Sequence, residues 1–475
     1  MTDTAAVTRR YLPWIVAIAL FMEQLDSTIV NTSIPAMAAS LGVTPLSLKA
    51  VSSSYILSLA VSIPISGWLA ERFGSRRVFL AAVALFTLSS VLCGLAPSAH
   101  LLVAARVPQG IAAAMMMPVG RMAIIRTFPK GELLRAMNFV IVPALLGPLL
   151  GPTVGGLIVH WLSWRDIFFV NVPVGLLCLW VGWRHMPDYR ADTVRPLDLR
   201  GFALFGSGIA LLSWLLEVFG EHGLTWRQAL LPLAVSALLL LGYGWHARRA
   251  PHPLLSLDLF RLRTFRVSVI GGFVTRLGVG GMPFLLPLLF QVGMGLPAWQ
   301  SGLLMMPAAL AAMGMKVISA TMLRHLGFRR VLMINTVLVA CTMALYALVG
   351  PATPLAVIVL LGLSMGLFNS LQFSSMNSMA YADVGDRDAA MASTIASTLQ
   401  QLSMSFGLAC GSLVAGLYLD DLPQSSPTAV IGALHHAFLT LAALTLVSSL
   451  MFRTLHVDDG DSVSRGRPAA APAAR

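Results

Sequence analysis

The chain has 475 residues, of which 57% are hydrophobic and only 11% charged, with a mean hydropathy of +0.80. Soluble domains carry about 25% charged residues, so this composition excludes a soluble protein and indicates a polytopic membrane protein. The hydrophobic runs are long and do not alternate, which favours spanning helices over a β-barrel. The net charge of +12 lies mostly in the predicted loops, so we expect no nucleic-acid partner.

The first hydrophobic stretch, residues 12–39, carries Glu23 and Asp26 near its middle. A charged side chain at mid-bilayer costs about 2.5–3.5 kcal/mol on insertion scales. The two acids are three residues apart, so they share one helix face. Because burial disfavours the charged form of a carboxyl group, we interpret the pair as a proton-binding face turned to a cavity. The alternative is a structural ion pair with a neighbouring helix.

Hydrophobic runs long enough to cross a core of about 30 Å follow one another along the chain. They are residues 12–39, 50–70, 78–96, 101–121, 137–160, 167–186, 201–219, 229–246, 266–290, 301–322, 331–349, 355–380, 392–417 and 431–452. With the N-terminus in the cytoplasm, 26 of the 32 Lys and Arg residues fall in cytoplasmic segments, three fall outside and three within spans. This asymmetry predicts fourteen spans with both termini cytoplasmic.

A short repeat divides the chain. Gly74-x-Arg-Arg-Val follows span 2, and Gly327-x-Arg-Arg-Val follows span 10. Spans 1–6 therefore map onto spans 9–14, and spans 7 and 8 are an insertion, as in transporters whose substrate site lies between repeats. The predicted parts are an N-terminal six-helix half (1–186), a linker with two inserted spans (187–265), a C-terminal six-helix half (266–453) and a disordered cytoplasmic tail (454–475).

The loop after span 2 is expected to fix two helix ends. Gly67 would let helices approach closely, and Gly74 would permit a tight turn with positive φ. Charge pairs within this loop could join Glu71, Arg72, Arg76 and Arg77. The alternative is plain anchoring by positive charge on the cytoplasmic side.

This loop, Gly67-x-x-x-Glu71-Arg72-x-Gly74-x-Arg-Arg, resembles the signature loop of the major facilitator superfamily, which usually has Asp where this chain has Glu71. Further stretches resemble motifs of its fourteen-span drug/proton antiporter branch, of the EmrB/QacA type. They are Leu25–Pro35, Leu102–Gly110, Gly147–Gly156 and Trp164–Gly175. The resemblance covers almost the whole chain and implies the all-α major facilitator fold. It also implies proton-coupled export of a drug or metabolite by alternating access, from the cytoplasmic (inner) membrane of a bacterium.

Arg106 lies within span 4. A buried guanidinium stays charged and needs an anion nearby, and Asp26 or Glu23 is the natural partner. The resemblance assigns this arginine to proton coupling. We expect protonation of the span 1 acid to loosen its tie to Arg106 and to bias the carrier towards one facing. A purely structural ion pair is the alternative.

Span 5 carries a strip of glycines at four-residue spacing, which lets another helix pack closely. The motif comprises Gly147, Pro148, Gly151, Pro152, Gly155 and Gly156. Its prolines invite a bend. The resemblance implies that this span controls facing and seals against leak, whereas close packing alone is the alternative.

The second half adds two bases within spans, Arg276 and Lys316. With Arg106 they outnumber the two intramembrane acids, which suits an anionic or zwitterionic substrate such as a carboxylate or an anionic metal chelate. Lys316 could instead extend towards the cytoplasmic end. Gln372 and Asn377 in span 12 could contact substrate or form hydrogen bonds between helices.

Enzyme motifs fail on their context. Gly362-x-Ser-x-Gly366 matches the nucleophile-elbow pattern, but that chemistry needs a strand-turn-helix and this stretch lies inside a hydrophobic span. No phosphate-binding loop occurs, so we expect the proton gradient, not ATP, as the energy source. We expect no enzyme activity, no cofactor and no bound metal. The expected partners of the monomer are a small-molecule substrate and the lipid bilayer. A non-transporting membrane sensor or scaffold is the alternative from another class.

Overall fold

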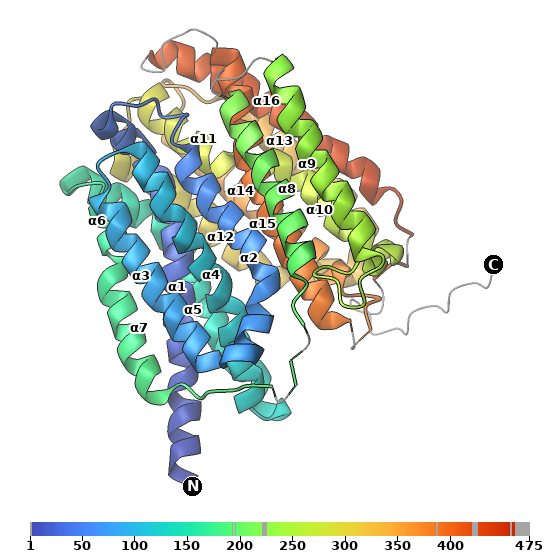
Figure 1. The fold of residues 1–475 in the computed structure, drawn as a ribbon. Helices are drawn as coiled ribbons and strands as arrows, with labels where there is room; N and C mark the ends of the chain where they lie inside the picture. The colour runs from blue at the N-terminus through green and yellow to red at the C-terminus, as the bar shows by residue number, and fades with distance from the viewer. Residues whose placement is uncertain are drawn as a thin grey trace.

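The computed structural model describes residues 2–191, 193–194, 196–220, 226–385, 388–419, 426–456 and 458–460, which form helices joined by loops (Figure 1). The α-helices are α1 (Thr2–Leu41), α2 (Lys49–Phe73), α3 (Ser75–Leu95), α4 (Ala99–Thr127), α5 (Lys130–Trp161), α6 (Asp166–Phe169), α7 (Asn171–His185), α8 (Leu199–Gly220), α9 (Trp226–Ala247), α10 (Arg263–Val279), α11 (Met282–Leu288), α12 (Ala298–Leu326), α13 (Phe328–Leu345), α14 (Leu355–Ala380), α15 (Ala389–Leu419) and α16 (Pro427–Phe452). Three short helices, η1 (Leu257–Arg261), η2 (Leu289–Gly293) and η3 (Tyr346–Leu348), complete the order.

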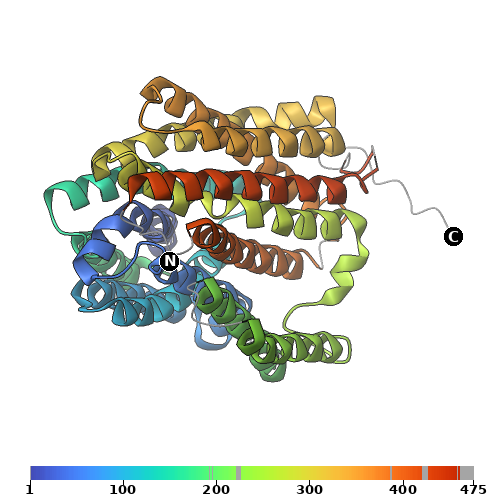
Figure 2. The ribbon, with the colours of Figure 1, turned by 90° about the horizontal axis from the view of Figure 1, so that it is seen from above.

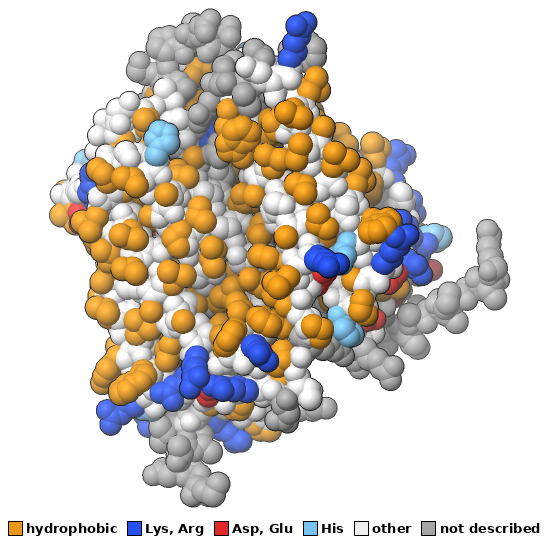
Figure 3. Space-filling model, viewed as in Figure 1, with side chains coloured by type: hydrophobic (Ala, Val, Ile, Leu, Met, Phe, Trp, Pro, Cys, Tyr) orange, Lys and Arg blue, Asp and Glu red, His pale blue; other side chains and the backbone are white. Residues whose placement is uncertain are grey.

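Within the described residues, 14 helical segments are long and apolar enough to cross a membrane, which confirms the predicted number of spans. Two of these segments are interrupted. The sixth, Asp166–His185, joins α6 to α7, and the ninth, Arg263–Gly293, joins α10, α11 and η2. Figure 3 shows hydrophobic side chains over the visible flank of the helices, while most Lys and Arg side chains gather towards its lower edge and right side.

Consecutive spans run in opposite directions, so their loops alternate between two ends of the bundle. We call the end that holds the α2–α3 loop the Gly74 end, and the end that holds the α1–α2 loop the Pro45 end. Gly74 and Gly327, the repeated loop glycines, have φ values of 98° and 76°. The prediction of a positive φ at Gly74 is therefore confirmed, and its counterpart in the repeat makes the same kind of turn.

The helices pack as two groups, α1–α7 and α10–α16, with α8 and α9 on the outside (Figure 2). In the first group α1 packs along α5, and α4 packs against α2 and α3. In the second group α12 packs along α14, and α10 packs against α15 and α16. The groups meet where α5 lies against α12 and where α2 lies against α15. The division at residues 186 and 265 into independent halves stays a prediction.

The hydrophobic core shows where the two groups are closed against each other. One core cluster at the Pro45 end combines Ile34 and Leu48 of the first group with Leu285 and Phe438 of the second. Towards the Gly74 end, each group has a core cluster of its own.

A further cluster joins Ala60 of α2 to Phe265 of α10 and Phe406 of α15, together with residues of the inserted helices. Burial of shared apolar surface stabilises contact. The shared cluster at the Pro45 end draws on more helices of both groups than the cluster around Ala60, so the groups are joined most extensively at the Pro45 end.

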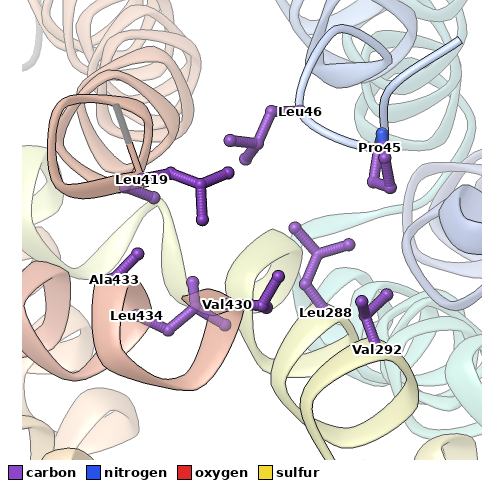
Figure 4. A pocket seen from close by; sticks show the side chains of 9 residues that line it. Pro45, Leu46, Leu288, Val292, Leu419, Val430, Ala433 and Leu434 are labelled. Atoms are coloured by element: carbon purple, nitrogen blue, oxygen red, sulfur yellow. The ribbon is translucent and has the colours of Figure 1, made fainter. Parts of the chain in front are cut away.

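An apolar pocket lies within this closed end. Figure 4 shows Pro45 and Leu46 of the α1–α2 loop facing Leu288, Val292 and Leu434 of the second group across the pocket. The α1–α2 loop therefore contributes side chains to the seam between the groups.

The Gly74 loop binds the segment that follows α7. Ser75 N–H donates to Tyr189 O at 2.9 Å, and Tyr189 N–H donates to Ser75 Oγ at 2.9 Å. Arg76 N–H donates to a carboxylate oxygen of Asp188 at 3.2 Å. The loop thus fixes two helix ends by holding the first residues of the following linker.

Two expectations for this loop are wrong. No atom lies within 4 Å of the position that a Cβ on Gly67 would take, so Gly67 permits no close helix approach here. Among the described residues, neither Glu71 nor Arg72 forms a salt bridge. The acid that serves the loop is Asp188, which also pairs with Arg190 at 3.5 Å. The acidic side chain that binds this loop therefore comes from the linker after α7 and not from the motif itself.

The second group repeats this arrangement after its last span. Asp459 forms a two-pronged ion pair with Arg263 at 2.6 and 3.1 Å, and a Cβ on Gly460 would collide with the ring of Phe328 beside Gly327. Residues 454–456 and 458–460 of the predicted tail are among the described residues, and these contacts place Asp459 and Gly460. Disorder of the tail stays a prediction. The remainder of the predicted tail, 457 and 461–475, lies outside the described residues.

The inserted pair is fastened at the Gly74 end by a buried carboxylate. Asp198, just before α8, accepts hydrogen bonds from His246 of α9 at 2.7 Å and from the N–H groups of Gly201 and Leu254 at 2.8 and 3.1 Å. Burial acts to raise the pKa of Asp198, but these hydrogen bonds outweigh it and lower that pKa below its ordinary value of 3.8. The carboxylate therefore ties both inserted helices to the linker that leads into α10.

Candidate functional site

The centre of the first group holds a buried ion pair between α1 and α4. Arg106 Nη1 donates to a carboxylate oxygen of Asp26 at 2.6 Å, and the two side chains are 1% and 0% exposed. The structure thus brings together the arginine and one of the two acids that the sequence singled out. Burying such a pair is costly in desolvation, and its net contribution to stability is often small or negative. Its presence at this depth therefore favours a role beyond stability.

The Asp26 carboxylate has two further donors. Gln109 Nε2 lies 3.1 Å, and Asn171 Nδ2 lies 2.8 Å, from its second oxygen. Both amides also donate to Ser90 Oγ, at 2.8 and 3.1 Å. Four helices, α1, α3, α4 and α7, are joined by this network. Charge-assisted hydrogen bonds of this kind stabilise the ionised form of Asp26.

The Arg106 guanidinium is equally enclosed. Its Nε donates to Val51 O at 3.1 Å and its Nη1 also donates to Gln109 Oε1 at 2.8 Å. The Tyr55 ring lies 4.2 Å from the guanidinium carbon and the Phe168 ring 5.9 Å from it. Carbonyl, amide, carboxylate and aromatic faces together replace the water that this cation has lost.

Glu23 differs from Asp26. It is 6% exposed, and its Oε2 has no hydrogen-bond partner among the described residues. The Tyr55 hydroxyl is likewise buried without a partner. The acid pair on α1 therefore consists of one fully bonded carboxylate and one carboxyl group without a donor.

Sequence reasoning did not single out four members of this network: Tyr55, Ser90, Gln109 and Asn171. Gln109 follows Arg106 by three residues on one helix face, and Asn171 lies in a recognised motif, so both carried a usable signal. Tyr55 and Ser90 carried none, because single polar residues in hydrophobic spans are common and only the packing of α2 and α3 brings them to Arg106 and Gln109.

The glycine strip of α5 lies against α1 and passes beside the acids. A Cβ on Gly147 would lie 2.5 Å from Gln24 Cβ, and one on Gly155 would lie 2.6 Å from Ile29 O. A Cβ on Gly151 would collide with Thr28. The expected close helix packing is present, and α5 continues as one helix through Pro148 and Pro152. Control of facing by this strip stays a prediction.

The other face of α5 meets the second group. A Cβ on Gly156 would lie 2.9 Å from Ala298 C and 3.0 Å from Trp299 Cα, and Thr153 Oγ1 donates to Gly302 O at 3.3 Å. One helix thus touches both α1, which carries the acids, and α12 across the seam. This makes α5 a physical link between the ion-pair site and the contact between groups.

Arg276 lies in a second polar site, between α10, α14 and α15. It is 5% exposed, and its guanidinium lies 3.5 Å from Gln400 Oε1 and 4.9 Å from the centre of the Phe373 ring. The same pocket is lined by Asn377 and Ser268. Among the described residues, no Asp or Glu forms a salt bridge with Arg276.

The two other predicted substrate residues lie elsewhere. Gln372 is fully buried and exchanges hydrogen bonds with Asn335 and Thr336 of α13, at 2.8 and 2.9 Å. Lys316 is exposed on α12 and does not line the Arg276 pocket. Of the four, the structure brings together Arg276 and Asn377. Within the part of the chain described, no three His, Cys, Asp or Glu side chains gather to hold a metal ion.

Comparison with known proteins places this geometry in a wider group. The profile of the Major Facilitator Superfamily matches residues 16–408. The chain is 40% identical over 473 residues to "Putative multidrug resistance protein MdtD" of Klebsiella pneumoniae (strain 342), covering 97% of each chain. It is 40% identical over 460 residues to the protein of the same name from Salmonella paratyphi A, covering 95% of this chain and 96% of that one.

Solved structures share the fold at low sequence identity. The transporter PepTSo of the POT family has a TM-score of 0.69 at 14% identity and covers 94% of this chain and 97% of that chain. A bacterial homologue of the human lysosomal transporter Spinster, in an inward-facing and unoccupied conformation, has a TM-score of 0.68 at 13% identity, covering 98% and 99%. The predicted all-helical class and its recognised fold are confirmed.

Proposed function

This chain belongs to the Major Facilitator Superfamily, whose members are secondary transporters rather than enzymes, and we propose that it exports small molecules from a bacterial cytoplasm in exchange for protons. The relatives named for multidrug resistance support drugs as one class of cargo. Proton exchange is supported by the acids and the arginine buried on α1 and α4.

The observation that carries the proposal is the Asp26–Arg106 ion pair with Glu23 beside it. Charged groups kept inside a membrane bundle default to function. Glu23, Asp26 and Arg106 couple proton binding to transport in this proposal. A change in protonation alters the net charge of this buried site, and the balance between conformations that pack differently around it then shifts. A gradient of one pH unit is worth about 1.4 kcal/mol per proton, enough to support a tenfold substrate gradient.

Alternating access is supported by the uneven core. The groups share their larger core cluster at the Pro45 end, whereas towards the Gly74 end each has a cluster of its own and only α2 joins a smaller shared cluster with the second group and the inserted helices. We assign the Gly74 end to the cytoplasm, because the predicted loops at that end hold most of the Lys and Arg residues. In this conformation the outer side is then closed, and the glycine strip of α5 transmits changes at α1 to the seam with α12.

The test is flux through purified protein in liposomes. Ethidium serves as the cationic drug probe and trapped pyranine reports proton movement. An imposed pH gradient should drive ethidium against its own gradient, accompanied by proton flow in the opposite direction, and a protonophore should abolish both. Ethidium transport that is indifferent to the pH gradient would refute proton exchange. If neither ethidium nor the anion citrate is transported, a non-transporting sensor or scaffold would be favoured.

A second candidate, export of an organic anion or anionic chelate, is favoured by Arg276. This guanidinium is almost fully buried in a pocket whose lining includes the amides of Asn377 and Gln400, and no Asp or Glu of the described residues forms a salt bridge with it. A carboxylate substrate would supply the missing charge through paired hydrogen bonds. If this candidate is correct, citrate should inhibit ethidium efflux by the wild-type protein. Arg276→Gln should abolish this inhibition, and Lys316→Gln should retain it. Indifference to citrate would remove this candidate.

A further inference from the structure

We propose that Glu23 is the carboxyl group that takes up and releases the exchanged proton, while Asp26 stays ionised as the fixed partner of Arg106, and that Tyr55 donates to Glu23 once the proton has left. This inference rests on the proposed proton exchange and assigns its steps to separate residues. It also replaces the expectation that protonation of the span 1 acid loosens its tie to Arg106.

The contacts of Asp26 leave little reason for it to accept a proton. Its oxygens receive hydrogen bonds from Arg106, Gln109 and Asn171 at 2.6, 3.1 and 2.8 Å. A proton on this carboxyl group would compete with those donors and would leave Arg106 buried without a counter-charge, which is strongly unfavourable. The side chain is also 0% exposed, so water has no direct access to it.

The surroundings of Glu23 favour the opposite behaviour. Its Oε2 receives no hydrogen bond from any described residue, and a charged carboxylate in this position would be both unbonded and close to Asp26. The neutral, protonated form removes the repulsion from Asp26 and lowers the cost of burying an unbonded group, since a neutral group is less costly to bury than a charge. Glu23 also keeps 6% of its surface exposed, whereas Asp26 keeps none.

Tyr55 is placed to stabilise the charged form when it occurs. Its ring is held against the Arg106 guanidinium at 4.2 Å, and its buried hydroxyl has no hydrogen-bond partner among the described residues, as is true of Glu23 Oε2. The ionisable groups that act on Glu23 are Asp26 on α1 and Tyr55 on α2. Cys93 on α3 and Arg106 on α4 act on Asp26, while α5 packs its glycine strip against α1.

The proton balance is simple. With Glu23 protonated, the site is neutral, since Asp26 and Arg106 cancel. Release breaks one O–H bond of Glu23, passes the proton to water and leaves one net negative charge, which the Tyr55 hydroxyl can then hydrogen-bond. Uptake from the other side of the membrane restores the neutral site.

Infrared spectroscopy of the purified wild-type protein tests this assignment without any substrate. The band of buried protonated carboxyl groups should fall as pH rises. It should be missing in Glu23→Gln, persist in Asp26→Asn, and be unchanged in Glu132→Gln, whose carboxyl is exposed at the start of α5. Tyr55→Phe should shift the fall to higher pH. A wild-type protein without a titrating band, or a band lost in Asp26→Asn and kept in Glu23→Gln, would overturn the proposal.

Transport separates this inference from the proposed function. In liposomes, Glu23→Gln should lose the ethidium gradient of about tenfold per pH unit, whereas the exposed control Glu132→Gln should keep it. Full gradient-driven efflux by Glu23→Gln would overturn the assignment. If the wild-type protein shows the titrating band but no pH-driven efflux, proton exchange fails as a function while Glu23 remains the proton-binding group.

Discussion

Gly302 offers a direct test of the closed seam at the Pro45 end. An alanine Cβ at this position of α12 would collide with Pro152 O and lie 2.9 and 3.0 Å from Pro152 C and Thr153 Cα of α5. Carbon atoms pack best at about 3.5–4.0 Å, and these neighbours are backbone atoms, so α5 and α12 must separate by roughly 0.5–1 Å. On the same helix, a Cβ on Gly314 would meet no atom within 4 Å.

Overpacking of this kind costs about 1–3 kcal/mol. Because the strain exists only while the seam is closed, Gly302→Ala should shift the balance between the closed and open Pro45 end by about 5- to 150-fold. The change from Gly to Ala also favours the helix by about 0.5–1 kcal/mol, but α12 is assumed to stay helical in both conformations, so this gain cancels. Gly314→Ala isolates that gain and should leave the balance unchanged.

The assay is the labelling rate of a cysteine inside the apolar pocket at the Pro45 end. Ala433→Cys places a thiol on the pocket lining, where the native side chain is 4% exposed. The more accessible native thiols, Cys341 and Cys410, are first replaced by serine. A polar maleimide should label this thiol at least several-fold faster in Gly302→Ala than in Gly314→Ala. Equal rates would refute the argument that the Gly302 contact closes this end.

Three further outcomes follow from the buried polar contacts. Asp26→Asn strands Arg106 and should destabilise the protein by about 3–5 kcal/mol, whereas adding Arg106→Met should restore much of the melting temperature in detergent; no recovery would contradict the ion-pair account. Asp188→Ala should loosen the linker at a cost of about 0.5–1.5 kcal/mol, seen as faster amide hydrogen exchange at Ser75. Folding lowers the pKa of Asp198, so the ionised carboxylate stabilises the folded protein above about pH 3.8, and this contribution is lost as the pH falls through the folded pKa. The difference in melting temperature between wild type and Asp198→Ala should therefore disappear in acid.

The number of membrane spans could be predicted from the sequence because hydropathy and charge are averaged over whole spans. Each hydrophobic run was long enough that small errors at its ends did not alter the number of crossings, and all fourteen were found. The interruptions in the sixth and ninth spans were not predicted. Composition cannot reveal them, because the breaks at Val170 and at Gly280–Gly281 are made of residues that also occur inside helices.

The candidate site was readable only in part. The pairing of Arg106 with an acid of span 1 followed from the cost of an isolated buried charge, but the choice of Asp26 depends on the rotation of α1 against α4. The loop charges were misassigned because Asp188 lies more than a hundred residues from Arg76 and only the fold brings them together. Sequence spacing predicts neighbours on one helix well and neighbours between helices poorly.

The position of α8 and α9 has a consequence for how cargo arrives. α8 packs against α15, and a Cβ on its Gly206 would lie 3.1 Å from Val61 of α2, so the inserted pair covers the line where α2 and α15 meet. The inserted pair would therefore block a hydrophobic compound dissolved in the lipid from entering between α2 and α15. Lateral entry between the groups would then have to use the opposite flank, beside α5 and α12.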